Sequence, residues 1–349
     1  MLYQLSIIFI LALTLVVIAR RAALAVGLVD KPNARKRHQG HIPLVGGIAI
    51  YLTLMLVTFW QPEWLPHSNI YLLCVTALVV LGVLDDRFDL PVAPRVIVQG
   101  GIALAMMLAA GMQLTSFGYL WGHQELMLGY IALLITPLAV WGAINAYNMV
   151  DGIDGQLGAL SCVTFIALAI LFGLAGQEKL AMWCLSLIAA LAAYLLFNLS
   201  MFGLRNKIFM GDAGSMVIGF SVLWLLIVAT QGQDAVIRPV TALWLIAIPL
   251  MDMVTVMVRR LLRRQSPFKA GRDHLHHILM RRGLNARQAL AMSCMLAVTL
   301  ACVGICSEVL QLPDYQMLVA FVLCFFGYFV MLHEPRQAPI FTDNPTADR

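Results

Sequence analysis

The feature that most limits how this chain can fold is a series of apolar runs, each about long enough to cross a lipid bilayer. A helix needs about 20 apolar residues to span the hydrocarbon core, and lipid offers no partner for unpaired backbone groups. Eleven such runs lie near residues 2–19, 45–60, 70–84, 96–112, 127–147, 157–175, 180–199, 215–230, 240–258, 289–306 and 317–333. The run at 70–84 is short, so we expect an all-α, polytopic integral membrane protein with about eleven, or ten, transmembrane helices.

The composition excludes an ordinary soluble protein. A length of 349 residues alone would suggest two or three soluble domains, but hydrophobic residues make up 61% of the chain and charged residues only 12%. We therefore expect residues 1–333 to form a single transmembrane domain with functional loops. Residues 334–349 are polar and contain three prolines, and we expect them to form a short disordered tail.

Basic residues predict which side of the membrane each loop faces. The first apolar run has no Lys or Arg before it and is followed at once by Arg20 and Arg21, which places the N-terminus outside. With eleven spans, 21 of the 23 Lys and Arg residues then fall on the cytoplasmic side, and only Lys179 and Arg238 fall outside. This asymmetry predicts a cytoplasmic C-terminus and five inner loops that carry nearly all the basic charge.

The third inner loop ends an apolar run with polar residues that a membrane span does not need. Asn148, Asp151 and Asp154 recur every three residues, so on a helix or tight turn they share one side. Gly152 and Gly155 follow the two carboxylates and allow a ligand to approach the backbone closely. A capped helix end followed by a turn is the simpler alternative, but two Asp-Gly pairs behind an Asn favour a site at the mouth of a helix.

The second inner loop begins with three acidic residues. Asp85, Asp86 and Asp89 share a face if the helix continues through them. Like charges this close repel one another, which suggests a metal, a cationic partner or proton chemistry. A solvated helix end is the alternative.

The fourth and fifth inner loops carry the remaining candidates. Phe209 precedes a Gly-Asp-x-Gly-Ser turn in which Asp212 is either a helix cap or part of a metal or phosphate site at a helix N-terminus. The fifth loop contains Arg272, His274, His276 and His277. A zinc site is conceivable there, but no Cys is nearby and the surroundings are basic, so contact with phosphate or sugar is favoured.

All five inner loops therefore carry polar features that membrane insertion does not require, and one composite cytoplasmic site explains them together. Carboxylates mixed with basic residues suit a phosphorylated substrate bound with Mg²⁺, which takes one or two carboxylates and fills its shell with phosphate oxygens and water. Phosphoryl transfer is the leading class. A transporter or flippase of lipid-linked or anionic substrates is the competing class, but transporters place charges at mid-membrane, where only Asp252 lies here. A passive scaffold leaves the carboxylates unexplained.

Four motifs, in this order along the chain, resemble those of the polyprenyl-phosphate N-acetylhexosamine-1-phosphate transferases. They are Asp85-Asp86-x-x-Asp89, Asn148-x-x-Asp151-Gly-x-Asp154-Gly, Phe209-Met-Gly-Asp212-x-Gly-Ser and His274-Leu-His-His277. The similarity extends from the first apolar run to at least Met280. Relatives that transfer phospho-N-acetylmuramoyl-pentapeptide have three adjacent histidines in the last loop, and the Leu after His274 argues against that peptidoglycan role.

The resemblance implies an enzyme of the bacterial inner membrane that transfers GlcNAc-1-phosphate from UDP-GlcNAc to undecaprenyl phosphate and releases UMP. This would be the first membrane step of O-antigen or a related envelope polysaccharide, with another UDP-N-acetylhexosamine as the alternative donor. The implied cofactor is Mg²⁺, or Mn²⁺ in its place. The implied partners are the two substrates and the bilayer, with no nucleic acid, and a homo-oligomer is compatible with the sequence.

The resemblance also implies roles for individual residues. Asp212 is the metal ligand with Asn148 beside it, Phe209 and Asp154 hold the uracil, and Arg272 and the histidines hold the sugar and diphosphate. The catalytic candidates are Asp85, Asp86, Asp151 and Asp154. The substrate-binding candidates are Asp89, Asn148, Phe209, Arg272, His274, His276 and His277.

The role of the first acidic pair is open on physical grounds. A lipid monophosphate has a second pKa near 6 and is already largely dianionic at pH 7, so an aspartate of ordinary pKa near 4 is a poor base for it. Asp85 and Asp86 either act as bases or position the lipid phosphate through a cation or a shared proton.

Overall fold

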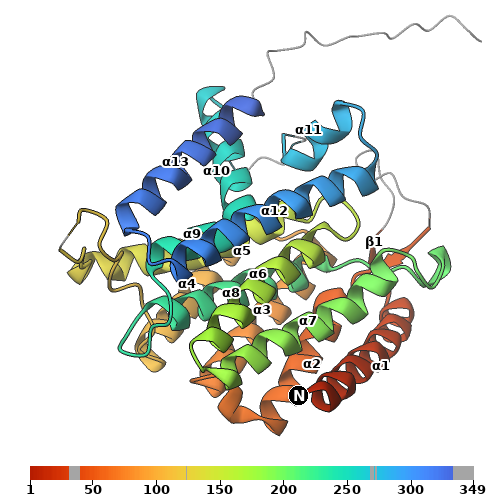
Figure 1. Ribbon diagram of the computed structural model, residues 1–349. Coiled ribbons are helices and arrows are strands. Elements are labelled where there is room, and N and C mark those ends of the chain that lie inside the picture. Colours follow the sequence, from red (N-terminus) through yellow and green to blue (C-terminus); the bar gives the residue numbers. More distant parts are fainter. Residues whose placement is uncertain (31–39, 123, 268–270, 272, 333–349) are drawn as a thin grey trace, which may run out of the picture.

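The computed structural model describes residues 1–30, 40–122, 124–267, 271 and 273–332, and its architecture is helical (Figure 1). The helices are α1 Leu2–Val26, α2 Gly46–Trp60, α3 Ser68–Phe88, α4 Val92–Ala109, α5 Ala132–Val150, α6 Gln156–Leu174, α7 Glu178–Asn198, α8 Gly211–Thr230, α9 Pro239–Leu245, α10 Ala247–Leu262, α11 Leu275–Arg281, α12 Ala286–Val309 and α13 Asp314–Met331. The predicted tail at 334–349 and the candidate Arg272 lie outside the described residues.

The number of candidate membrane spans can be compared with the expected eleven, or ten. Within the described part of the chain, nine helices are long and apolar enough to cross a membrane, and the bent pair α9 and α10 makes a tenth if it counts as one span. The run at 45–60 forms α2, which has 15 residues and is about 22 Å long, short of a core of about 30 Å. The all-α, polytopic class is confirmed, whereas the count of eleven is not.

The bend between α9 and α10 has a local cause in the sequence. The two helix axes differ by 81°, and the break falls at Ile246. Pro249 lies in the first turn of α10, where its ring would clash with the carbonyl of Leu245 and its nitrogen has no proton to donate. The chain therefore turns sharply at this point and enters α10 in a new direction.

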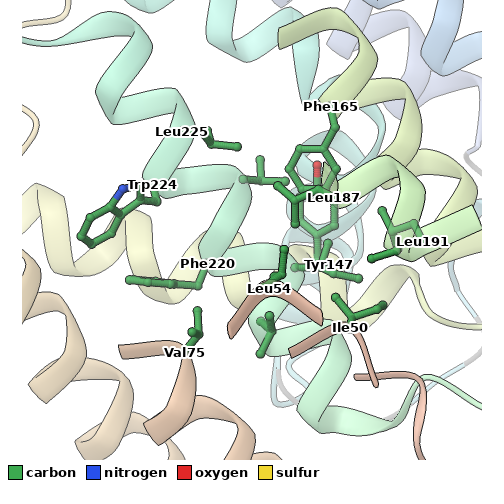
Figure 2. Packing of buried hydrophobic residues seen from close by; sticks show 14 of the residues in the cluster. Ile50, Leu54, Val75, Tyr147, Phe165, Leu187, Leu191, Phe220, Trp224 and Leu225 are labelled. Carbon is green, nitrogen blue, oxygen red and sulfur yellow. The ribbon is translucent and has the colours of Figure 1, made fainter. Parts of the chain in front are cut away.

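Helix α8 is the centre of the bundle. In its most apolar 18-residue window 94% of the residues are buried, against 22–56% for the other candidate spans, and it contacts α2, α3, α5, α6 and α9. Figure 2 shows Phe220, Trp224 and Leu225 of α8 among side chains from α2, α3, α5, α6 and α7. A helix this enclosed fixes the position of whatever side chain lies at its first turn.

Glycines let two neighbours approach that first turn closely. A Cβ placed on Gly47 of α2 would overlap the backbone of Gly214, and one placed on Gly82 of α3 would overlap the backbone of Ala213. Small residues at helix contacts are the usual means of tight packing in membranes, where apolar burial alone gives no preference for protein over lipid. The result is that α2 and α3 meet α8 beside Asp212.

The last helices form a second apolar cluster that joins α9, α10, α11, α12 and α13. In Figure 1, α10, α11 and α13 are grouped at the top of the view, and α12 runs between this group and α6. Leu275 and Ile278 of α11 are buried in this cluster. The histidine motif is therefore carried by a short helix that is packed into the protein.

A small antiparallel sheet connects the first inner loop to the start of α8. Strand β1, Val29–Asp30, pairs with β2, Ile42–Pro43. The chain then continues beside Phe209, whose N–H donates to the Pro43 carbonyl at 2.9 Å and whose carbonyl accepts from Gly46 N at 2.9 Å. The backbone hydrogen bonds thus fix the position of Phe209, and its half-buried side chain lies near the start of α8.

Candidate active site

Three helix ends meet at Asp212, in the first turn of α8. Its Oδ1 accepts a hydrogen bond from Asn148 Nδ2, at the end of α5, over 2.6 Å. Asn148 Nδ2 also lies 2.9 Å from Ser215 Oγ. The helix cap is Met210, so Asp212 is not the cap that the simpler interpretation of this motif expected, and its carboxylate contacts residues of the other motifs.

Asp86, at the end of α3, completes this group. Its Oδ1 accepts from the Asp212 backbone N–H at 3.0 Å. Its Oδ2 is buried and has no hydrogen-bond partner among the described residues. Gly211 has a φ of +74°, and a Cβ there would lie 2.5 Å from Asp86 Oδ2, so glycine is needed for this approach. A buried carboxylate oxygen without a partner calls for a proton or a cation.

Asp85 has a different environment from its neighbour. Its side chain is 2% exposed, its Oδ1 accepts from Leu90 N at 2.8 Å, and its Oδ2 pairs with Arg95 Nη1 at 2.9 Å. Both oxygens are therefore occupied by protein groups. Arg95 was missed at the sequence level, where it is one of many inner-loop basic residues, although its position shortly after the acidic cluster is a signal that could have found it.

Asp151 and Asp154 follow α5 in the turn that leads to α6. Desolvation by the surrounding protein first, then the charges of Asp212 and Asp154, raise the pKa of Asp151 to about 7. The second and third motifs thus share one electrostatic environment. The helix end expected here is present, because α5 ends at Val150 and the acidic turn begins there; that the turn forms a site stays a prediction.

A second group lies around Phe209. Lys207 Nζ is 2.6 Å from Asp154 Oδ2 and 5.2 Å from the centroid of the Phe209 ring. Buried Asn198 joins the two segments, since its Oδ1 accepts from Gly155 N at 2.6 Å and its Nδ2 donates to the Ile208 carbonyl at 2.9 Å. Asn198 was not among the predicted residues, although an Asn at the end of an apolar run is a visible signal.

The histidine motif reaches this face through α11. A Cβ on Gly152 would overlap the ring of His276, so the motif lies against the acidic turn. His276 is 1% exposed; burial first, then the neighbouring His277, lower its pKa to about 3. Both ring nitrogens of His276 are without a hydrogen-bond partner among the described residues. A neutral, buried imidazole of this kind has bonding capacity that a substrate can use.

The donor set fits a magnesium ion in type and in number. No group of three His, Cys, Asp or Glu side chains in the described ranges has the arrangement of a protein metal cage. Mg²⁺ does not require one, because it is usually held by one or two carboxylates with phosphate and water. Asp212, Asn148 and the unpartnered oxygen of Asp86 supply oxygens of the right kind.

Two candidates are not placed in this group. Asp89 is the C-cap of α3 with a φ of 51°, and its side chain is exposed, with no described contact to the other carboxylates. The prediction that it shares a face with Asp85 and Asp86 assumed a continuing helix, and the helix ends at Phe88. Arg272 lies outside the described residues and stays a prediction.

Comparison with known proteins agrees with this geometry. Residues 68–230 match the model of glycosyl transferase family 4, a range that includes the acidic motifs and Asp212. The chain is 48% identical to the undecaprenyl-phosphate α-N-acetylglucosaminyl 1-phosphate transferase of Yersinia pestis, over 94% of this chain and 90% of the relative. Proteins with the same name are 48% identical in Escherichia coli (strain K12), over 92% and 88% of the two lengths, and 42% identical in Haemophilus influenzae, over 92% and 90%.

Proposed function

This chain belongs to the family of the undecaprenyl-phosphate α-N-acetylglucosaminyl 1-phosphate transferases, and from that premise we propose that it transfers GlcNAc-1-phosphate from UDP-GlcNAc to undecaprenyl phosphate and releases UMP. The observation that carries the proposal is the convergence of the ends of α3, α5 and α8 on Asp212, beside an unpartnered oxygen of Asp86. A site with negative charge and unfilled bonds fits a cation-bound diphosphate.

The transfer is a direct displacement at phosphorus. An oxygen of the lipid phosphate forms a bond to the phosphorus that carries GlcNAc, and the bond from that phosphorus to the bridging oxygen breaks, so that UMP leaves with the electron pair. The lipid phosphate is largely dianionic at pH 7, so it needs no base. What it needs is a positive group to hold it near another anion.

Arg95 meets that need. Its guanidinium is 30% exposed, while its partner Asp85 is nearly fully buried, so the arginine can face a substrate on one side. Asp85 fixes the guanidinium on the other side through the 2.9 Å contact. In this account Asp85 orients Arg95 for the lipid phosphate and does not take a proton from it, and the contact between the two side chains supports that role.

The metal and the donor nucleotide occupy the two other parts of the site. Asp212, Asn148 and Asp86 would hold Mg²⁺, or Mn²⁺ in its place; the ion, when bound, neutralises charge on the diphosphate. Phe209 gives the uracil a ring to stack on, and Asp154 and Lys207 offer an acceptor and a donor to its edge. Asn198 holds these groups in register.

The active face is the cytoplasmic one in this account. UDP-sugars are made in the cytoplasm, and the basic residues of the chain accumulate in the loops that join the site. The reaction would then be the first membrane step of an envelope polysaccharide such as O-antigen, in the inner membrane of a bacterium.

A transporter is the remaining alternative, and it would draw on the bend between α9 and α10 and on the buried Asp252. Both oxygens of Asp252 accept hydrogen bonds from described protein groups, His274, Leu275 and Tyr328. A carboxylate occupied in this way is poorly suited to carry an ion or a proton across the membrane, and nothing else here favours transport.

The test is UMP release by the purified protein from UDP-GlcNAc and undecaprenyl phosphate with Mg²⁺. Release should require the lipid, stop with EDTA and be restored by excess Mg²⁺. UDP-GalNAc in parallel reactions establishes the donor. No UMP release by well-folded protein with any UDP-N-acetylhexosamine would contradict the proposal, as would release that is independent of lipid.

A further inference from the structure

Asp252 is a buried carboxylate that the proposed reaction does not use. It lies in α10 just beyond the bend and is 2% exposed. Removing a carboxylate from water costs several kcal/mol unless other groups compensate. Such a residue needs partners that compensate for its burial, and these partners indicate its role.

Three groups from two other segments surround Asp252. His274 Nδ1 lies 2.8 Å from Oδ2, while Leu275 N at 2.8 Å and the Tyr328 hydroxyl at 3.0 Å both donate to Oδ1. His274 and Leu275 begin α11, and Tyr328 belongs to α13. One carboxylate of α10 therefore joins the start of the histidine motif to α13.

The contact to His274 also determines which nitrogen carries its proton. A carboxylate only accepts hydrogen bonds, so Nδ1 of His274 is the donor in this pair. In the neutral ring Nε2 is then the acceptor. A carboxylate behind a histidine fixes the tautomer and ring direction in this way in many active sites.

The ring of His274 is linked to the acidic turn through the neighbouring ring of His276. The rings of His274 and His276 are stacked, with centroids 5.8 Å apart and planes 4° apart, and His276 lies against Gly152, next to Asp151. A change in the ring direction of His274 would displace the stacked ring of His276. It would thereby alter the side of the acidic turn at which the donor substrate is proposed to bind.

We propose that Asp252 is a positioning residue, which holds His274 in its Nδ1-protonated form so that Nε2 accepts a hydrogen bond from a hydroxyl or amide N–H of the donor sugar. The inference rests on the proposed function, because the sugar is the ligand. Tyr328 and the Leu275 N–H have a supporting role, since they orient the carboxylate.

The variant Asp252→Asn distinguishes a role in positioning His274 from a purely structural role of this side chain. The Asn oxygen can still accept from Leu275 and Tyr328, while its amide would donate to His274 Nδ1 and leave the proton on Nε2. The Asn side chain has the shape of the Asp side chain, but the donor and acceptor nitrogens of the His274 ring are exchanged. Losing the outer partner of a metal-bound histidine typically costs about 10–100-fold, and we expect a loss of the same order for a histidine that binds the sugar. The value of kcat/KM for UDP-GlcNAc should therefore fall by about that factor, while the melting temperature stays close to that of the wild type.

Tyr328→Phe is the matched control. It removes one hydrogen bond to the same carboxylate and leaves the tautomer of His274 unchanged. Its kcat/KM should fall less than tenfold. If both variants lose the same activity, or if Asp252→Asn keeps more than half of the wild-type value, the positioning role is wrong.

The tautomer itself is measured by ¹⁵N NMR of histidine-labelled protein, with His274→Gln to identify the signal. Wild-type protein should show the Nδ1-protonated form, and Asp252→Asn the Nε2-protonated form. An Nε2-protonated His274 in the wild type overturns the inference even if the Asn variant does not fold. This readout is independent of transfer, so a wild type without transferase activity would defeat the proposed function alone.

Discussion

The two ends of the helical bundle use charge in opposite ways. At the end of α8 away from the site, Arg238 pairs with Glu308 at 3.2 Å and with Asp314 at 3.1 Å. Thr241 also donates to Glu308, and Tyr119 N donates to Asp314 at 2.8 Å. The charges there are of both signs and bond to one another.

At the other end, carboxylates of α3 and of the turn after α5 gather around Asp212, and two groups have unfilled capacity among the described residues, the Oδ2 of Asp86 and the ring of His276. The comparison teaches how to distinguish a structural polar cluster from a functional one. The groups of the structural cluster find their hydrogen-bond and charge partners within the cluster, whereas the functional cluster is completed by a bound ligand.

The largest expected effect is that of Asp212→Asn. Losing one group that stabilises transition-state charge typically costs about 10²–10³-fold in kcat, and Mg²⁺ dependence should weaken as well. The melting temperature of the purified protein should change little, because Asp212 completes no internal ion pair in the described contacts. UMP release at saturating substrate concentrations measures the fall in kcat. If Asp212→Asn turned over as fast as the wild type, the distinction between the structural and the functional cluster would be wrong.

Glu308→Gln should have the opposite profile. Replacing this carboxylate weakens its charged hydrogen bonds to Arg238 and Thr241 at a cost of about 1.5–3 kcal/mol, which corresponds to a melting temperature lower by roughly 2–4 °C in a chain of this size. Turnover at low temperature should be retained, since no substrate group is involved. A variant of Glu308 that melts normally but has lost turnover would mean that this end also takes part in the chemistry.

Asn198→Ala should have a smaller, local effect. It leaves Gly155 N and the Ile208 carbonyl without their partner, at a cost of about 1–3 kcal/mol for buried groups, and it loosens Asp154 relative to Phe209. The KM for UDP-GlcNAc should rise about tenfold at most, with kcat little changed. A fall in kcat at constant KM would place Asn198 with the reacting groups instead.

Proton release on Mg²⁺ binding is the smallest expected effect. With its pKa raised to about 7, Asp151 is largely protonated below pH 7 in the metal-free protein and ionised above it. A bound cation favours the ionised form, so binding at pH 6.5 should release up to one proton, and binding at pH 8.5 should release almost none. Calorimetry in buffers of different ionisation enthalpy measures this, and equal release at both pH values would exclude Asp151 as the source.

The sequence predicted the parts of the fold that depend on local patterns. Apolar runs located the helices, and polar residues at the end of one such run, Asn148, Asp151 and Asp154, located the acidic turn of the candidate site. The sharp bend at Ile246 was missed, because its apolar run continues through Pro249 without interruption. The run at 45–60 was counted as a full span although α2, with 15 residues, is as short as that run. The run at 70–84 was judged short because its apolar residues end at Asp85, yet α3 continues to Phe88.

The division of roles within the site could not be predicted from spacing. Asp85 and Asp86 are adjacent in sequence, yet one pairs with Arg95 on α4 and the other with the backbone of Asp212 on α8. Neighbouring residues on a helix point about 100° apart, so which partner each one meets depends on the packing of α3, α4 and α8. Asp252 likewise appeared as an isolated acid in a span until its contact with His274 was known.

The central claim is that one site has two separate anion-binding parts, with Asp212 for the metal-bound nucleotide and Arg95 for the lipid phosphate. Calorimetric titration of Arg95→Gln with UDP-GlcNAc and Mg²⁺ tests it most directly, with Asp212→Asn as the matched variant. The account predicts that Arg95→Gln binds the nucleotide sugar as the wild type does, although its turnover falls by about 10²-fold, whereas Asp212→Asn loses binding. Equal loss of nucleotide binding in the two variants would contradict the division.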